Sequence, residues 1–183
     1  MNKIILAIVG LTGSGKTETV EYLMKKTSWP KVYFGDATFD EMKKSGLEIN
    51  EANERKTREE LRKNLGMGAY AILNLPKIKK LFESSSVVVE SLYSWEEYLE
   101  VKKEFGDIFK VLAIFSPLEE RIKRLESRPH RPLSKEEVIS REHSQIENLH
   151  QAGPIACADF TVINNGSKEE LYKKLDEVIS KLS

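Results

Sequence analysis

The chain has 183 residues, enough for one domain with a hydrophobic core of its own. Lysines and arginines together number 29, as do aspartates and glutamates, so the formal net charge is zero and gives no electrostatic reason to expect nucleic acid or a membrane surface as a partner. The single cysteine, Cys157, excludes a disulfide framework, and no apolar stretch approaches the roughly 20 residues of a membrane span, so we expect a cytoplasmic protein.

The first predicted element is a strand over residues 4–9, an unbroken apolar run rich in β-branched side chains that suits a strand covered on both faces. It leads into Gly10-Leu11-Thr12-Gly13-Ser14-Gly15-Lys16-Thr17, which fits the phosphate-binding pattern of glycine, four residues and Gly-Lys-Ser/Thr. A helix is predicted over residues 18–26. The pattern therefore stands between a strand and a helix, which is the context that it requires.

The chemistry of this loop explains its residue types. Glycines allow bare backbone to approach a phosphate chain, and the following helix directs its N-terminal N–H groups and positive dipole end toward the phosphates. Lys16 is predicted to contact the β- and γ-phosphates of ATP, and the Thr17 hydroxyl to ligate Mg²⁺. The predicted nucleotide-binding residues of the loop are Gly10, Gly13, Ser14, Gly15, Lys16 and Thr17.

Further along, short apolar runs alternate with helical segments. Strands are predicted at residues 32–34, 87–89, 110–115 and 160–163, and helices at 50–63 and 68–82, the second of which Pro76 should bend or split. Four later helices are each predicted from a serine followed three residues on by a glutamate, a capping box: Ser94 with Glu97, Ser116 with Glu119, Ser134 with Glu137 and Ser167 with Glu170. This alternation predicts an α/β fold, a parallel sheet with helices on both faces, whose ligands lie at the carboxyl ends of the strands.

Two carboxylates follow predicted strands. Asp36 comes after the second strand and Glu90 after the third. A kinase of this architecture needs a carboxylate near its acceptor and another near Mg²⁺, so either residue is a candidate base or metal partner. The alternative is that Asp36 is a turn residue and Glu90 a solvated loop carboxylate.

Arginines gather in two places. Arg121, Arg124 and Arg128 share one helix face, and with Arg141 they predict a lid over residues 121–145 that closes over phosphates. Arg62, with two further arginines on the same face of the helix at 50–63, is a candidate for binding the acceptor. The alternative in both places is a solvated helix face whose arginines pair with neighbouring glutamates.

Several of these motifs resemble the P-loop kinases of the dephospho-CoA kinase and nucleoside monophosphate kinase group. The resemblance lies in Arg121-x-x-Arg124-Leu125-x-x-Arg128, in Arg141-x-x-Ser144-Gln145 and in the run from Ala158 to Ser167, while the middle of the chain looks closer to uncharacterised archaeal adenylate-kinase-related proteins. The resemblance implies that Arg124, Arg128 and Arg141 contact ATP phosphates and that the loop at 164–167, with Asn164 and Gly166, lies against adenine. It also implies strand order 2-3-1-4-5 and a role for Asp36 as the base.

The chain departs from adenylate kinases at two positions. Phe39-Asp40 and Leu92-Tyr93-Ser94 stand where those enzymes carry arginines that hold the phosphate of the acceptor. The resemblance therefore supports a kinase but does not select its acceptor.

The sequence predicts a single P-loop NTPase-fold kinase domain over residues 1–183, with a five-stranded parallel sheet, an acceptor-binding helical lobe at about 37–82 and a small helical lid. The predicted reaction is Mg²⁺-dependent phosphoryl transfer from ATP to a small nucleotide-like acceptor, of nucleoside monophosphate or dephospho-CoA type, by a monomer or homodimer. Asp36, Arg62 and Glu90 are predicted to bind the acceptor, and Thr17 and Asp36 the metal. The alternative is a nucleotide-dependent switch or binding protein that hydrolyses ATP slowly.

Overall fold

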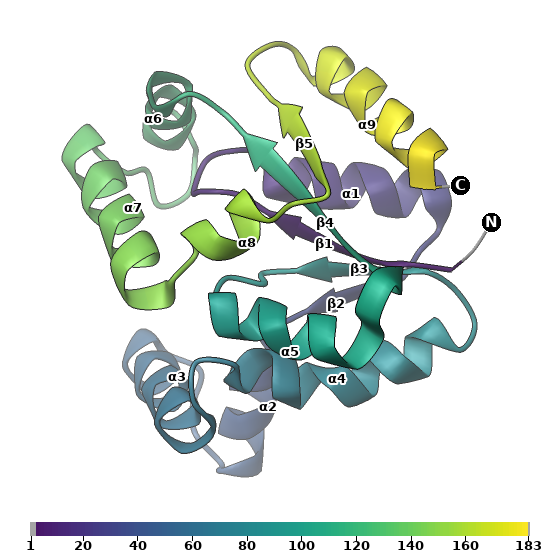
Figure 1. Ribbon diagram of the computed structural model, residues 1–183. Helices are drawn as coiled ribbons and strands as arrows, with labels where there is room; N and C mark the ends of the chain where they lie inside the picture. The colour runs from purple at the N-terminus through teal and green to yellow at the C-terminus, as the bar shows by residue number, and fades with distance from the viewer. Residues whose placement is uncertain (1–2, 183) are drawn as a thin grey trace.

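The computed structural model describes residues 3–182 and contains a five-stranded parallel sheet in the order β2-β3-β1-β4-β5 (Figure 1). This is the order implied by the resemblance. The strands are β1 (Ile5–Val9), β2 (Lys31–Tyr33), β3 (Val87–Glu90), β4 (Phe109–Phe115) and β5 (Phe160–Ile163).

Helices cover both faces of the sheet. Helices α1 and α9 pack on one face and α4 and α5 on the other, while α2 and α3 stand at one side of the strand ends and α6 and α7 at the other (Figure 1). The helices are α1 (Lys16–Thr27), α2 (Asp36–Lys44), α3 (Glu51–Leu65), α4 (Ala69–Phe82), α5 (Trp95–Phe105), the 3₁₀ helix η1 (Gly106–Ile108), α6 (Leu118–Glu126), α7 (Lys135–Leu149), α8 (Ala152–Ala156) and α9 (Lys168–Leu182).

The central strand β1 shows why the sheet is covered on both sides. Ile5, Ala7 and Val9 belong to the core under α4 and α5, whereas Leu6 and Ile8 belong to the core under α1 and α9. All five side chains are at most 1% exposed. Burial of alternate residues on opposite faces is what an unbroken apolar strand of a parallel sheet predicts, and the prediction is confirmed.

The register of the strands sets the position of the site. Glu90 pairs with Ile8 on one side and with Tyr33 on the other, so the carboxyl ends of β1, β2 and β3 lie together. The phosphate-binding loop starts immediately after β1. The phosphate-binding loop after β1, Asp36 after β2 and Glu90 at the end of β3 therefore lie at the same edge of the sheet.

Helix α4 runs unbroken through Pro76, so of the two outcomes predicted there, a bend or a split, the split does not occur. One local prediction is wrong. Ser116 does not cap a helix: α6 begins after Pro117, and the Ser116 hydroxyl instead donates a hydrogen bond to the Asn164 carbonyl at 2.7 Å. The capping boxes of α5 and α7 are confirmed, and Ser167 and Glu170 exchange the same reciprocal bonds at the start of α9.

Helices α2 and α8 were not predicted as separate elements. Both are short, and α8 has only five residues, so neither offers a long periodic pattern. Among residues 3–182, no helix has the length and apolar character needed to cross a membrane.

Candidate nucleotide and acceptor site

The loop between β1 and α1 has the backbone conformation of an anion-binding loop. Gly10, Gly13 and Gly15 have φ values of 141°, 81° and 101°, which side-chain-bearing residues rarely adopt. A Cβ atom at Gly10 would lie 2.4 Å from the Ile114 carbonyl oxygen, and one at Gly15 would lie 2.3 Å from the Asn164 side-chain amide. Both the conformation and the close contacts therefore require glycine here, as the motif predicts.

Ser14 supports a phosphate at this loop more directly. Its side chain is 1% exposed, and its hydroxyl has no hydrogen-bond partner within residues 3–182. Buried polar atoms in native proteins are nearly always hydrogen-bonded, so an unpartnered hydroxyl in a phosphate-binding loop fits a ligand that completes it.

Lys16 begins α1 and lies among charged groups from three other elements. Its ammonium donates a hydrogen bond to the Leu11 carbonyl at 3.0 Å. The pKa of Lys16 is lowered from 10.5 to about 8, first by burial and then by the charge of Arg141, whereas the charge of Glu90 acts in the opposite direction. The lysine of the loop, an arginine of α7 and the carboxylate at the end of β3 are therefore electrostatic neighbours.

Thr17 is exposed at the second residue of α1. Within residues 3–182, no cluster of three or more His, Cys, Asp or Glu side chains could hold a metal ion by itself. Mg²⁺ commonly uses one or two protein oxygens together with substrate phosphates and water. The Thr17 hydroxyl and the Glu90 carboxylate at the neighbouring strand end are oxygen donors of this kind and fit such an ion.

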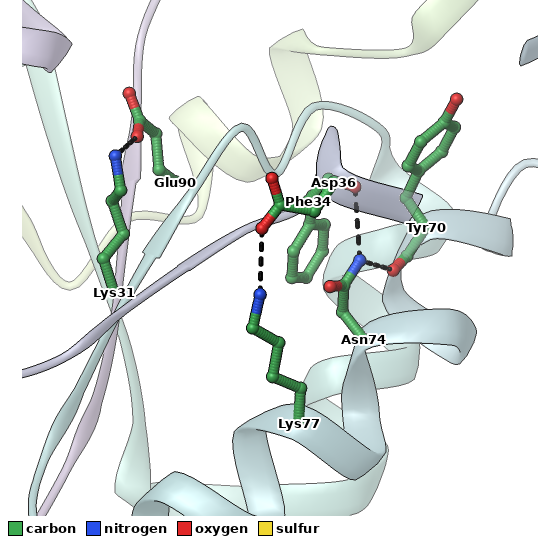
Figure 2. A network of polar contacts seen from close by, with 7 residues as sticks. All are labelled: Lys31, Phe34, Asp36, Tyr70, Asn74, Lys77 and Glu90. Atoms are coloured by element: carbon green, nitrogen blue, oxygen red, sulfur yellow. Dashed lines mark hydrogen bonds and ion pairs between the residues drawn. The ribbon is translucent and has the colours of Figure 1, made fainter. Parts of the chain in front are cut away.

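The two candidate carboxylates differ in their surroundings (Figure 2). Glu90 pairs with Lys31 of β2 at 2.7 Å, and its side chain is 14% exposed. Asp36, the first residue of α2, pairs with Lys77 of α4 at 2.9 Å, and its side chain is 41% exposed. Glu90 influences the pKa of Lys16, whereas Asp36 is not among the groups that do so. Of the two, Glu90 is therefore the carboxylate that acts electrostatically on the lysine of the phosphate-binding loop.

Asn74 fixes the chain at the end of β2. Its side-chain amide is 4% exposed and donates to the carbonyls of Phe34 and Tyr70 at 3.2 and 2.9 Å (Figure 2). This bond holds the Phe34 carbonyl against α4, two residues before Asp36. Asp36 is thus directed toward α4 and its Lys77.

The predicted lid arginines have separate contacts. Arg124 donates to the Asn164 carbonyl at 3.0 Å, the Ser116 hydroxyl at 3.2 Å and the Gly13 carbonyl at 3.5 Å, so it joins α6 to the phosphate-binding loop and to the end of β5. Arg128 donates to the Arg131 carbonyl in the loop after α6. Its contact with phosphates stays a prediction.

The loop after β5 lies against the phosphate-binding loop. The Asn164 amide donates to the Ser14 carbonyl at 2.8 Å, and Asn164 is 7% exposed. Gly166 is exposed and close to Glu170 of α9. Asn164 therefore shapes the phosphate-binding loop, while Gly166 stands further out.

A cavity of about 500 Å³ opens beside the strand ends, between α3 and α7. Arg141, Gln145 and Leu149, spaced by four, form its α7 wall. Its other lining residues come from the ends of β2 and β3, from α2 to α5 and from the loop before α7: Tyr33, Gly35, Thr38, Phe39, Glu51, Glu54, Arg58, Arg62, Tyr70, Ser91, Tyr93, Glu97 and Arg131.

Comparison with known proteins identifies the family. A family model described as AAA domain matches residues 6–149. A UPF0200 protein of Thermococcus kodakarensis is 33% identical over 187 residues, covering 98% of this chain and 100% of that protein. The chain belongs to the UPF0200 family and to the AAA domain family. A UPF0200/UPF0201 protein of Archaeoglobus fulgidus is 34% identical over 181 residues, and the chain spans 56% of its length.

Solved structures confirm the fold of the UPF0200 chain. A shikimate kinase from Bacteroides thetaiotaomicron has a TM-score of 0.61 at 13% identity, covering 97% of this chain and 98% of that one. A gluconokinase from Sinorhizobium meliloti has a TM-score of 0.60 at 12% identity, covering 98% and 93%. At such identities the likeness shows the fold alone, and the fold is that of P-loop kinases, as the sequence resemblance implies.

Sequence reasoning missed the residues that join α7 and α8 to the phosphate-binding loop of the UPF0200 chain. The Thr12 hydroxyl donates to Gln145 Oε1 at 2.9 Å, and Gln151 Nε2 donates to the Gly10 carbonyl at 3.0 Å. Both glutamines are at most 8% exposed. A lone glutamine in a helical segment has no local signal of such a role, because its partner is more than 130 residues away.

Glu97 is a second residue that sequence reasoning assigned only to a capping box. It is 1% exposed beside the cavity, and one carboxylate oxygen accepts from the backbone N–H groups of Tyr93 and Ser94 at 2.7 and 3.1 Å. Burial raises the pKa of Glu97 from 4.5 to about 7, although these hydrogen bonds and Arg62 oppose the rise.

We expect Glu97 to make folding stability pH-dependent. The folded chain holds this proton up to about pH 7, whereas the unfolded chain releases it near 4.5, so the stability gained from the proton is full below pH 4.5 and is lost as the pH rises to about 7. The loss amounts to at most roughly 3 kcal/mol for the full shift from pKa 4.5 to about 7. Urea unfolding at several pH values should show a smaller loss over this interval for Glu97→Gln than for the wild type. A control variant, Glu100→Gln, should keep the wild-type slope, and an equal slope in Glu97→Gln would contradict the assignment.

Proposed function

We propose that the protein transfers the γ-phosphoryl group of ATP to a small-molecule acceptor bound in the cavity between α3 and α7. The observation that carries this proposal is that α7 serves both sites: Gln145 bonds to Thr12 of the phosphate-binding loop and also lines the cavity. A kinase needs its donor and acceptor side by side with water excluded, and a helix shared by the two sites supplies that arrangement.

The residues of the loop have distinct roles in this proposal. Lys16 neutralises charge on the β- and γ-phosphates, and the backbone of residues 10–15 cradles them. Thr17 would hold Mg²⁺, which when bound supplies charge neutralisation between the β- and γ-phosphates. Arg141, an electrostatic neighbour of Lys16, adds a second cation from α7 on the side of the cavity.

Arg124 has a positioning role in this account. Its guanidinium bonds to Gly13 and Asn164, and Asn164 bonds to Ser14, so it supports the shape of the phosphate-binding loop. Arg128 lies in the loop between α6 and α7, from which a closing movement over bound nucleotide would bring it toward the phosphates.

Glu90 is the better candidate for the carboxylate that takes the proton of the acceptor or holds a metal-bound water. The charge of Glu90 raises the pKa of Lys16, and its strand, β3, pairs with β1. Asp36, which the family resemblance favours as the base, is directed to Lys77 instead. The proposed assignment therefore moves from Asp36 to Glu90.

Paired variants test this choice. We expect Glu90→Gln to lower kcat by roughly 10²–10⁴-fold, the usual contribution of a general base. Asp36→Asn should lower it by less than about ten-fold, because the Asp36 side chain is 41% exposed and paired with Lys77. Steady-state kinetics with a coupled ADP assay measures both, and the reverse ranking would return the role to Asp36.

Ligand-dependent thermal unfolding tests the proposed function itself. Mg²⁺-ATP should raise the melting temperature of the wild type, and an acceptor should raise it further when a non-hydrolysable ATP analogue is present. A ligand at a hundred times its Kd adds about 2.7 kcal/mol of stability. Stabilisation by ATP alone, with slow hydrolysis and no transfer to any acceptor, would instead favour a nucleotide-dependent switch.

A further inference from the structure

We infer that Gln145 is a catalytic residue, whose side-chain Nε2 donates a hydrogen bond to the phosphoryl group while that group passes from ATP to the acceptor. The inference deepens the proposed phosphoryl transfer and rests on it. Its basis is that Gln145 binds the phosphate-binding loop through its amide oxygen, lines the acceptor cavity, and has an amide nitrogen without a partner among residues 3–182.

Gln145 contacts the phosphate-binding loop at the end where the γ-phosphate is expected. Lys16, the proposed ligand of the β- and γ-phosphates, donates a hydrogen bond to the Leu11 carbonyl at 3.0 Å. Thr12 is the next residue, and its hydroxyl donates to Gln145 Oε1 at 2.9 Å. Because Gln145 also lines the cavity proposed for the acceptor, its amide lies at the boundary that the γ-phosphoryl group has to cross.

The amide nitrogen of Gln145 is available to a ligand. Nε2 has no hydrogen-bond partner within residues 3–182, and it does not belong to the unpaired side-chain atoms that are fully buried there. Phosphate oxygens are acceptors at neutral pH. A bound phosphoryl group therefore favours the orientation in which the Thr12 hydroxyl holds the amide oxygen and the nitrogen faces the group.

Gln151 shows how a glutamine that only docks against the loop is arranged. Its Nε2 donates to the Gly10 carbonyl at 3.0 Å, and its side chain is 1% exposed and does not line the cavity. The donor group of Gln151 is therefore used within the protein. Of these two glutamines, Gln145 is the one that accepts from the loop and keeps its donor for the cavity.

Several contacts fix Gln145 against the loop. The Gln151 backbone N–H donates to the Gln145 backbone carbonyl at 3.1 Å. Glu142, one turn earlier on α7, pairs with Arg121 at 2.8 Å, and Arg121 donates to the Thr12 carbonyl at 3.4 Å. Helix α7 thus holds Thr12 directly through its hydroxyl and, by way of Arg121, through its carbonyl. A donor that is held in place before the reaction needs no reorganisation when charge develops.

The step balances without any proton from Gln145. An oxygen of the acceptor forms a bond to the γ-phosphorus of ATP as the bond from that phosphorus to the β–γ bridging oxygen breaks, and ADP leaves. Any proton on the attacking oxygen passes to solvent. Charge in such a transition state is spread over the equatorial oxygens of the phosphoryl group, and Nε2 donates to one of them. An interaction that is strongest midway lowers the barrier and leaves the affinity for ATP nearly unchanged.

Two variants that break the same hydrogen bond test the inference. Thr12→Val removes the hydroxyl and leaves the amide of Gln145 in place, whereas Gln145→Met removes both the bond and the donor. The rate is that of a single turnover of [γ-³²P]ATP hydrolysis with protein in excess, because water accepts the same phosphoryl group. We expect Gln145→Met to lower this rate by roughly 10- to 100-fold, as for a lost hydrogen bond to a charged group, and Thr12→Val by about five-fold or less.

Further variants serve as controls. Gln145→Glu keeps an oxygen that accepts from Thr12 but has no N–H, so its rate should fall at least as far, and it decides the case if Gln145→Met does not fold. Ser144→Ala, at the exposed neighbouring position outside the cavity, should keep the wild-type rate. The Kd of a non-hydrolysable ATP analogue, measured by calorimetry, should change little in Gln145→Met.

Three results would overturn the role of Gln145. Equal rates in Thr12→Val and Gln145→Met would show that Gln145 only docks α7, and a wild-type rate in Gln145→Glu would show that no donor is needed. A loss of analogue affinity as large as the loss of rate would place the hydrogen bond in ATP binding. A parallel incubation of the wild type with a small-molecule extract of an archaeal culture tests the kinase function separately, since label in inorganic phosphate alone would contradict a kinase whatever the ratio of the variants.

Discussion

Replacing Lys16 with methionine is expected to remove phosphoryl transfer and at the same time make the folded protein more stable. Turnover should fall by roughly 10²–10³-fold or more, as when a preorganised group that stabilises transition-state charge is lost. The gain in stability arises because burial disfavours the charged lysine, whose pKa is lowered from 10.5 to about 8. Below pH 8 the folded state carries the full cost of this charge, at most roughly 3 kcal/mol for a shift from pKa 10.5 to about 8.

The sign of this effect can be checked with pH. Between pH 8 and 10.5 the unfolded chain holds the Lys16 proton and the folded chain does not, so the free energy of unfolding of the wild type should rise over this interval. Lys16→Met should lack that rise and should have the higher stability at pH 7. Kinetics and urea unfolding on the same samples provide the measurement. Full turnover in Lys16→Met would contradict the proposed mechanism, and lower stability at pH 7 would contradict the burial of the charge.

The second large effect is expected at Arg121, which joins α6, α7 and the phosphate-binding loop. Arg121 is 4% exposed, pairs with Glu142 of α7 at 2.8 Å and donates to the carbonyls of Ser116 and Thr12 at 3.0 and 3.4 Å. Arg121→Ala leaves a mostly buried carboxylate and two carbonyls without their partner. We expect a loss of roughly 3–5 kcal/mol of stability, the usual cost of breaking a buried ion pair from one side.

Two matched variants separate the loss of the Arg121 ion pair from the effect of any substitution on α6. Lys123→Ala on the same helix removes an exposed ion pair with Glu120 and should change stability by less than about 1 kcal/mol. The double variant Arg121→Met, Glu142→Leu should recover much of the loss, because it removes both charges together. Denaturant unfolding measures all three. Wild-type stability in Arg121→Ala would show that the ion pair does not hold α7 to the phosphate-binding loop.

The fold could be predicted from the sequence because its signals are local. The apolar runs of β1 and β4 are long enough to identify buried strands, and the glycines at 10, 13 and 15 identify the phosphate-binding loop. The capping boxes at Ser94 and Ser134 gave the starts of α5 and α7 correctly. In each case the residues that form the feature are within a few positions of one another.

The contacts that the sequence did not predict depend on distant partners. Ser116 has the spacing of a capping box, but the carbonyl of Asn164 is within reach once β4 and β5 pair, and the hydroxyl binds there instead. Asp36, whose role as base stays a prediction, pairs across the fold with Lys77 of α4, and nothing in its local sequence indicates that contact. Local spacing carries no information about which of two distant groups a side chain will meet.

The cavity itself was only partly visible in the sequence. Because ligands of parallel sheets bind at the carboxyl ends of the strands, the sequence indicated Glu90 and the residues after it. The helical spacing of the α3 arginines indicated Arg62. The wall that α7 contributes was not predicted, because it depends on the contacts that Gln145 of α7 and Gln151, just before α8, make with the distant phosphate-binding loop.

Transfer of label from [γ-³²P]ATP tests the central claim most directly. Wild type and Lys16→Met are incubated with the labelled nucleotide and a small-molecule extract of an archaeal culture, and the products are separated by chromatography. We predict label in an organic phosphate with the wild type and none with Lys16→Met. Label found only in inorganic phosphate, with or without the extract, would contradict a kinase and favour a nucleotide-dependent switch.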